Sequence, residues 1–120
     1  MATITAVVTE GPNGYNNLEQ VLWPSLTETN NDGSAISNPQ NSDRSVHAWG
    51  TFGGTSIALQ GSNELSPVNW VPVNDPSGTA ITFTTAGSAQ IAENMLHYRV
   101  LLTGGTSTTV NVVMLSRRTG

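Results

Sequence analysis

Apolar and polar residues alternate along this chain in short runs, which are separated by clusters of Gly, Pro, Asn and Asp. This pattern is typical of successive strands in an antiparallel all-β domain, whereas helical periodicity is nearly absent. A first strand is predicted over 3–10, and it ends at the turn sequence GPNG of residues 11–14. A second strand is predicted over 19–26, where Pro24 indicates an edge strand or a bulged one.

Residues 44–52 show the clearest alternation. Val46 and Ala48 fall on one face of this predicted strand, and His47 and Trp49 fall on the other. If the first face meets the core, Trp49 points outward. An outward tryptophan is best explained by something that covers it, such as another subunit.

Two glycine-rich connections predict hairpins, because glycine permits the positive φ angles that a short connection needs. The first contains the diglycine 53–54, and the second contains the diglycine 104–105. The strands that these hairpins would pair are 44–52 with 56–61, and 98–102 with 109–115. The strand over 109–115 carries apolar residues on both faces, which predicts a central or covered position.

Shorter strands are predicted over 70–73 and 80–84, and residues 88–94 have the length for one helical turn. Taken together, the predicted strands number about eight and recur at intervals near ten residues, which predicts an antiparallel β-sandwich. Jelly-roll connections are one way to wire such a sandwich. We expect residues 1–120 to form a single domain of this kind.

The segment 27–43 departs from the strand pattern. Its sequence, TETNNDGSAISNPQNSD, offers little to bury apart from Ala35 and Ile36. It is predicted to be a long surface loop. Loops of this length in a compact domain are usually functional or mobile, so a partner contact and simple flexibility both remain open.

Composition limits the size of the core and the kinds of site that the chain can form. A chain of 120 residues with 37% hydrophobic content has enough material for one compact core. The absence of cysteine excludes disulfides, zinc thiolate sites and thiol nucleophiles. No window approaches 18 consecutive apolar residues, and the N-terminus lacks the features of a signal peptide. We expect a soluble protein made without export, with no membrane partner.

Charge excludes a further class of partner. All 4 basic residues are arginine, and 8 acidic residues leave a formal net charge of -4. A protein that binds nucleic acid by neutralising phosphates needs a concentrated basic surface, which this chain cannot supply. Nucleic acid is therefore not an expected partner.

Candidate chemistry is sparse. His47 and His97 are the only histidines, and neither stands in a metal-ligand spacing. The sequence NNDG at 30–33 lacks the spaced carboxylates of a calcium loop. The acidic residues are scattered singly, mostly in predicted turns. We therefore predict no catalytic residue, no metal site and no cofactor.

The three tryptophans admit two interpretations. Aromatic rings on a β-sandwich stack on sugars, which would make Trp49, and with it Trp23, a carbohydrate-binding surface. Large aromatic residues are also needed for the core of so small a domain. Core packing is the favoured interpretation for Trp70.

Several segments, taken in order and spacing, resemble a group of small virion proteins encoded among the structural genes of tailed bacteriophages. The likeness covers roughly residues 43 to 118. Its first part comprises DRSV at 43–46, GTFGG at 50–54, IALQGSN at 57–63 and Trp70. It continues through DPSG at 75–78, ITFT at 81–84, Tyr98-Arg99, TGGTS at 103–107 and Arg117-Arg118. One departure is the turn over 63–69, which is longer than the tight turn expected there.

This resemblance implies a non-enzymatic capsid component, with a decoration or cement protein on the outside of the head as the favoured role. Its expected partners are the major capsid protein and further copies of itself in a small symmetric oligomer. Its expected location is the virion surface, after synthesis in the bacterial host cytoplasm. The alternatives are a tail or fibre-attachment subunit, and a carbohydrate-binding module. The candidate interface residues are Trp23, Trp49, Ile36, Arg117 and Arg118.

Overall fold

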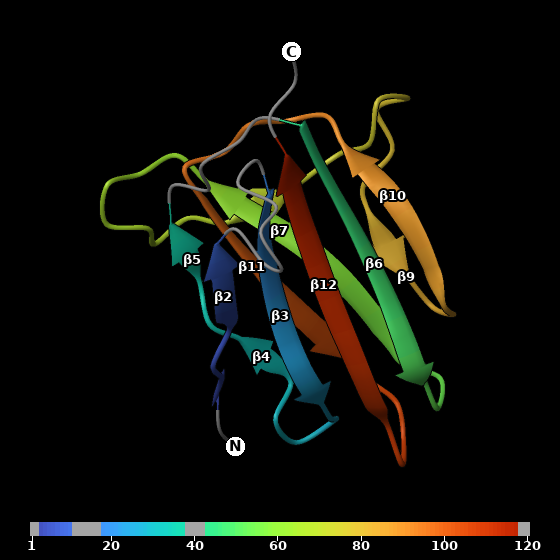
Figure 1. Ribbon diagram of the computed structural model, residues 1–120. Helices are drawn as coiled ribbons and strands as arrows, with labels where there is room; N and C mark the ends of the chain where they lie inside the picture. Colours follow the sequence, from blue (N-terminus) through green and yellow to red (C-terminus); the bar gives the residue numbers. More distant parts are fainter. Residues whose placement is uncertain (1–2, 11–17, 38–42, 118–120) are drawn as a thin grey trace.

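The computed structural model describes residues 3–10, 18–37 and 43–117, and these residues form twelve strands in two sheets that pack face to face (Figure 1). No helix occurs in the described residues. The prediction of an all-β sandwich is confirmed. The helical turn expected at 88–94 is wrong, because the strand β10 (Gly87–Ile91) occupies most of that segment.

A five-stranded sheet carries the longest strands and has the order β10-β6-β12-β3-β2. All four of its pairings are antiparallel. Besides β10, its members are β6 (Asp43–Thr51), β12 (Thr109–Arg117), β3 (Leu18–Leu26) and β2 (Val7–Glu10). As predicted, β12 lies at the centre.

The seven-stranded sheet is built mostly from short strands around β11 and β7, and its path is β1-β4-β11-β7-β8. In addition, β5 pairs with β11 and β9 pairs with β7. Its members are β1 (Thr3–Ile4), β4 (Asp32–Gly33), β5 (Ile36–Ser37), β7 (Ser56–Ser62), β8 (Val71–Pro72), β9 (Thr82–Phe83) and β11 (His97–Thr103). The β1·β4 pair is parallel.

From β3 to β12, the strand pairs are nested along the chain: the outermost pair joins the first and last strands, and each further pair lies within the preceding one. The first strand, β3, pairs with the last, β12, and the segment β4–β5 pairs with β11. Next, β6 pairs with β10, and β7 pairs with β8 and β9. Each of these pairs is antiparallel, and successive pairs alternate between the sheets. This strand order has jelly-roll wiring, which the sequence analysis named as one way to connect a sandwich.

The two predicted hairpins are wrong. The connection at 52–55 leads from β6 in the five-stranded sheet to β7 in the seven-stranded sheet, and 104–108 leads from β11 back to β12. Neither pair of consecutive strands is hydrogen-bonded together. Each connection is an arch that crosses between the sheets. The alternation of side chains is the same for an arch and a hairpin, so the sequence pattern could not separate them.

The two arches lie side by side and stabilise each other. The backbone N–H of Thr106 donates to the carbonyl of Gly53 at 2.9 Å, and Thr108 Oγ1 donates to the carbonyl of Phe52 at 2.9 Å. Thr55 Oγ1 donates to the carbonyl of Thr103 at 3.1 Å. These bonds satisfy backbone groups at the end of the sandwich where no strand ladder reaches them.

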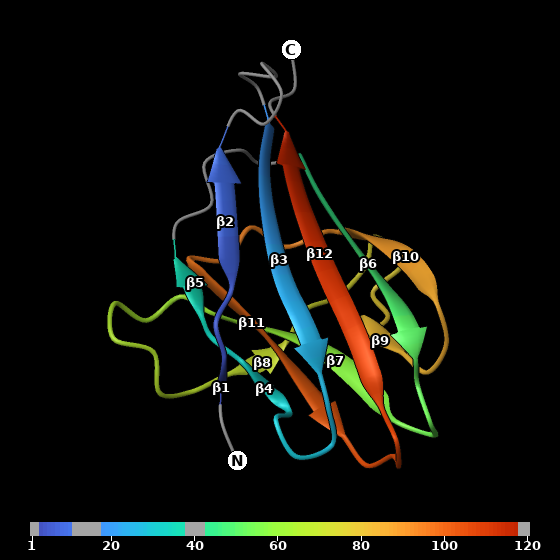
Figure 2. The same ribbon diagram turned by 60° about the horizontal axis from the view of Figure 1, so that its bottom comes forward.

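The N-terminal segment closes one side of the sandwich. The single strand predicted over 3–10 is interrupted, because β1 belongs to the seven-stranded sheet and β2 to the five-stranded one (Figure 2). Ser34 holds the crossing point: its N–H donates to the carbonyl of Ile4, and its Oγ accepts from the N–H of Ala6, both at 2.8 Å. This segment therefore bridges both layers.

The strand β3 is bulged, as Pro24 indicated. Its register with β12 shifts between Val110 and Val112, and Ser25 has a φ of 55°.

The segment 27–43, predicted as a surface loop, contributes β4 and β5 to the seven-stranded sheet. Residues 38–42 of it lie outside the described part of the chain.

The core fills the space between the sheets. Inward residues alternate with outward ones along the long strands, and Val46 and Ala48 are buried as their period-two spacing predicted. The largest fully buried side chains are Trp23, Tyr98, Leu26, Ile57, Leu59, Leu102 and Met114.

Candidate interaction surfaces

Trp49 lies on the outer face of the five-stranded sheet, as the sequence predicted. Its side chain is 40% exposed, and its ring stacks on that of His47 two residues earlier on β6, with centroids 5.0 Å apart and planes inclined by 29°. The stacking holds a large aromatic ring against the sheet while much of it remains in contact with water. His47 therefore supports the Trp49 ring.

An apolar row crosses the sheet next to this pair. In register, Val7 of β2 faces Leu22 of β3, Leu22 faces Val113 of β12, and Val113 faces His47 of β6. Val113 is only 6% exposed although it lies on the outer face, because its cross-strand neighbours cover it. We call Val7, Leu22, Val113, His47 and Trp49 the Trp49 face. Its members include no Asp, Glu, Lys or Arg.

Two of the predicted interface residues belong to the core instead. Trp23 is 0% exposed, and its Nε1 donates to the carbonyl of Ser34 at 2.8 Å. Ile36 on β5 is also buried. Both side chains belong to the hydrophobic core between the two sheets, where residues of the opposite sheet help to cover them. They are therefore corrected to core residues, and Trp23 is not accessible to a sugar.

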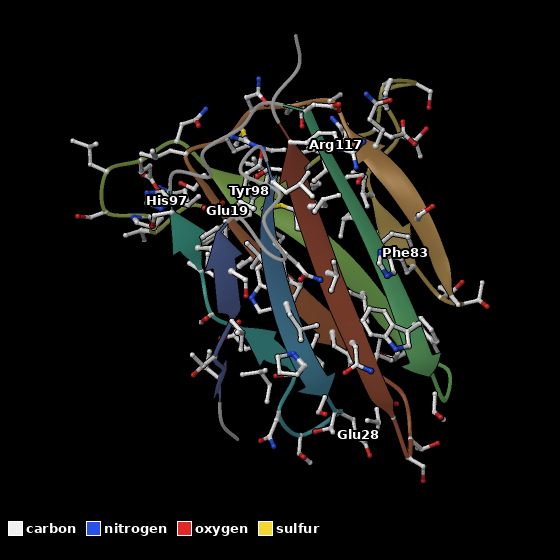
Figure 3. The ribbon with its side chains drawn as sticks, in the orientation of Figure 1. Glu19, Glu28, Phe83, His97, Tyr98 and Arg117 are labelled. Atoms are coloured by element: carbon white, nitrogen blue, oxygen red, sulfur yellow. The ribbon has the colours of Figure 1, made fainter. Side chains whose placement is uncertain are left out.

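The predicted basic end is described only in part. Arg117 is the exposed last residue of β12, and it pairs in register with Asp43 of β6 (Figure 3). A hollow of about 250 Å³ is lined by Asp43, Ser45, Leu115 and Arg117. Arg118 lies outside the described residues. The role of Arg117 and Arg118 as interface residues stays a prediction.

The sequence analysis missed a second apolar surface, which lies in the connection between β7 and β8. Leu65 is 91% exposed and Val68 is 78% exposed. We call residues 63–69 the Leu65 loop. The signal for it was present in the extra length of this turn and in its apolar residues, which a plain solvent-exposed turn does not require.

The Glu64 carboxylate organises the Leu65 loop. It accepts hydrogen bonds from the N–H groups of Asn69 at 2.7 Å and Val68 at 2.9 Å, from Asn69 Nδ2 at 3.0 Å and from Ser62 Oγ at 3.4 Å. The backbone donors of Asn69 and Val68 are the main reason why the pKa of Glu64 falls from 4.5 to about 2. The ionised carboxylate thus holds the loop in one conformation.

The base of the loop is anchored to the sheet. His97 Nε2 lies 2.7 Å from the carbonyl oxygen of Glu64, and its Nδ1 lies 2.8 Å from Ser37 Oγ. Trp70, expected in the core, is half-buried at the surface, where the Arg99 guanidinium lies 4.4 Å from its ring centroid. Arg99 Nε also donates to Gln60 Oε1 at 2.8 Å.

The ionisable groups in the described ranges do not converge on a reactive centre. They contain no cluster of three or more His, Cys, Asp or Glu side chains that could hold a metal ion. His47 lies on the outer face of the five-stranded sheet and His97 supports the Leu65 loop, so the two histidines serve separate surfaces. The same ranges contain no helix that is long and apolar enough to span a membrane.

The two main candidate interaction surfaces are therefore apolar. They are the Trp49 face on the five-stranded sheet and the Leu65 loop beside the seven-stranded sheet. Both contain exposed apolar side chains. Their burial against a neighbouring surface is favourable, because it removes apolar area from water. No protein-family model and no curated protein matches this chain.

Proposed function

We propose that this protein is a non-enzymatic structural component of a tailed-phage virion, which decorates the outside of the capsid and stabilises it by binding the major capsid protein. The assignment to a virion rests on the resemblance of residues 43–118 to small phage structural proteins. The observation that carries the binding role is the exposed Trp49 on the outer face of the five-stranded sheet.

The Trp49 face has the properties of a docking surface. Tryptophan is among the residues that contribute most to protein interfaces, above all where the ring is held in place before binding. The His47 ring holds Trp49 in this way. On the same face, the exposed side chain of Val7 and the half-buried side chain of Leu22 add apolar area. A standard stable contact buries about 800 Å² per partner.

Stabilisation of a shell would follow from mass action. A protein that binds the assembled shell, and not its loosened form, shifts the equilibrium toward the assembled form. Because the Trp49 face contains no Asp, Glu, Lys or Arg, its contribution to binding comes mainly from burial of apolar area. We expect this contribution to depend little on ionic strength.

The test is to count copies of the chain in intact virions by calibrated mass spectrometry, and then to strip the particles and add the protein back. Wild-type protein should rebind at many copies and raise the temperature at which heads burst. Trp49→Ala should rebind poorly. Val71→Ala is the matched control, because Val71 is 49% exposed on the other sheet and should rebind normally.

A count of only a few copies per particle would contradict decoration and favour the tail or fibre-attachment alternative. Absence of the chain from virions would overturn the proposal altogether.

The second candidate function is carbohydrate binding at Trp49. It is favoured by one observation, the partly exposed aromatic ring on the outer face of a β-sandwich. A glycan array with wild-type protein and Trp49→Ala separates it from decoration. Sugar binding that is lost in the variant would support this candidate, and no binding to any glycan would remove it.

A further inference from the structure

Strand β10 (Gly87–Ile91) forms one edge of the five-stranded sheet (Figure 1). On one side it pairs with β6 in antiparallel register. In such a pair, residues that direct their N–H and C=O groups toward the partner alternate with residues that direct them away. No strand of the described residues pairs with the outer side of β10. The backbone groups on that side are therefore a template for a further strand.

The other edges of the sandwich have features that discourage strand pairing. The strands β1, β5 and β9 have two residues each, β8 contains Pro72, and β2 has four residues and ends in Glu10. Short length, proline and charge are common means by which edge strands avoid pairing with other chains. In contrast, β10 has five residues, and the segment 80–92 contains neither proline nor a charged residue. Strand β10 is thus the least protected edge.

The side chains of β10 leave its edge accessible. Gly87, Ser88 and Gln90 are exposed, and Ala89 is half-buried. Three of the five residues in GSAQI are Gly, Ser or Ala, whose short side chains screen the backbone little. A strand from another molecule could therefore approach to hydrogen-bonding distance.

An antiparallel strand of the same sequence matches this edge. If Ala89 lies opposite Ala89 of a second copy, Gly87 lies opposite Ile91, so the smallest residue of the strand faces the largest aliphatic one. On the outer face of the sheet, Ser88 lies opposite Gln90, and a hydroxyl group meets an amide that can hydrogen-bond with it. No charged side chain of either strand enters the contact.

The acidic groups near β10 also permit this arrangement. They lie beyond its Ile91 end, where Glu93 Oε1 accepts from the N–H of Asn74 at 2.9 Å and Asp75 follows in the chain. Because the strands are antiparallel, the two copies place these groups at opposite ends of the contact. The two Glu93 residues are separated by about eight residues of strand, or roughly 26 Å. Charges separated by more than the screening length of about 8 Å interact weakly at physiological ionic strength.

We propose that two copies of this chain pair through their β10 strands, antiparallel and about a twofold axis at Ala89, so that the two five-stranded sheets join into one. The contact is isologous, since each copy contributes the same surface. The twofold axis is perpendicular to the joined sheet, and both Trp49 faces therefore point in one direction. Only the use of these two faces for docking depends on the proposed function.

The first experiment measures self-association by sedimentation velocity over a wide range of protein concentrations. A single strand pair is smaller than a standard interface, so we expect wild-type dimers toward the upper end of the range. The double variant Ser88→Lys/Gln90→Lys places like charges opposite each other twice in the dimer. It should weaken association about tenfold. The matched control, Ser66→Lys/Thr103→Lys, adds the same charge at exposed positions away from β10 and should associate like the wild type.

The second experiment tests the register by mixing variants of opposite charge. Ser88→Glu/Gln90→Glu should be as monomeric as the lysine variant when it is alone. In a mixture of the two, each lysine lies opposite a glutamate, and we expect mixed dimers to form. Both positions lie beside the Trp49 face, because Ser88 pairs with His47, so rebinding to virions is not the readout. Circular dichroism checks that the variants are folded.

A third measurement needs no substitution. Hydrogen exchange of the β10 amides that point away from β6 should slow down as the wild-type concentration rises, because pairing removes them from water. Exposed amides of the Leu65 loop serve as the internal reference and should exchange at a constant rate.

A wild type that stays monomeric at every concentration would overturn the proposal and leave the edge of β10 to a strand of another protein. Association that survives the lysine variant, mixed variants that do not associate, or β10 amides whose exchange is independent of concentration would overturn it as well. None of these results decides the proposed function, which is judged by the presence of the chain in virions and by the effect of Trp49→Ala on rebinding.

Discussion

Arg44 Nη1 donates a 2.7 Å hydrogen bond to the phenol oxygen of Tyr98, and this bond joins the two sheets inside the sandwich. Both side chains are buried, and the guanidinium carbon lies 5.3 Å from the centroid of the Tyr98 ring. The same oxygen accepts from the N–H of Met95 at 2.9 Å and donates to the carbonyl of Glu93 at 2.6 Å. Tyr98 thereby also fixes the chain that leads into β11.

Tyr98→Phe removes this oxygen and keeps the ring. We expect it to lower the free energy of unfolding by about 2–3 kcal/mol, because buried donors and an acceptor lose a partner. Urea unfolding followed by circular dichroism measures the loss. A variant as stable as the wild type would mean that the hydroxyl group contributes nothing to the joint between the sheets.

Glycines 53 and 54 offer a matched pair in the first arch. Both have positive φ, 59° and 84°. A Cβ atom on Gly53 would collide with the Thr106 carbonyl oxygen of the second arch, whereas one on Gly54 would have nothing within 4 Å. We expect Gly54→Ala to cost about 1–2 kcal/mol from backbone strain alone.

Gly53→Ala should cost clearly more than Gly54→Ala, since it adds the collision between the arches to the same strain. Thermal unfolding of both variants makes the comparison. Equal losses would show that the arches are not packed against each other as described.

The charge of Glu64 links the conformation of the Leu65 loop to pH. Its pKa is about 2 in the folded protein against 4.5 ordinarily. A lowered pKa contributes stability that is fully present above pH 4.5 and is lost as the pH falls through 2. Glu28 and Asp75, whose pKa values are also lowered, act in the same direction.

Glu64→Gln should therefore be less stable than the wild type at pH 7, and the difference between the two should shrink as the pH falls from 4.5 toward 2. Urea unfolding at several pH values gives the difference, and a carbon NMR titration gives the pKa of Glu64 directly. A carboxylate that titrates near 4.5 would contradict the role assigned to it.

Substitution by alanine should reduce stability strongly at Trp23 and only slightly at Trp49. Trp23→Ala opens a cavity in the core and should cost about 3–5 kcal/mol of stability, with folding lost in a marginal background. Trp49→Ala should change stability by about 1 kcal/mol or less, since much of the ring is already exposed. Its effect should appear in binding.

Thermal unfolding and intrinsic fluorescence distinguish the two. The emission of Trp49 should be shifted to longer wavelength than that of Trp23, because it contacts water. A strong loss of stability in Trp49→Ala would assign its ring to packing and remove it from the docking surface.

Local patterns in the sequence account for much of the secondary structure. Strict alternation in 44–52 predicted the inward and outward sets of β6, including exposed Trp49. Pro24 predicted the bulge in β3, and the diglycines predicted where the chain reverses. These features depend on local geometry, that is, on the period of a strand, the fixed φ of proline and the freedom of glycine.

The sheet that each strand joins depends on long-range contacts, which local patterns do not specify. The diglycine connections became arches, Ile36 became a core residue through its pairing with β11, and the Leu65 loop acquired its order from Glu64. Each outcome depends on contacts between residues far apart in the chain or on a side chain that folds back on its own loop. Alternation fixes which face a residue occupies, but it carries no information on which strand or sheet will lie against that face.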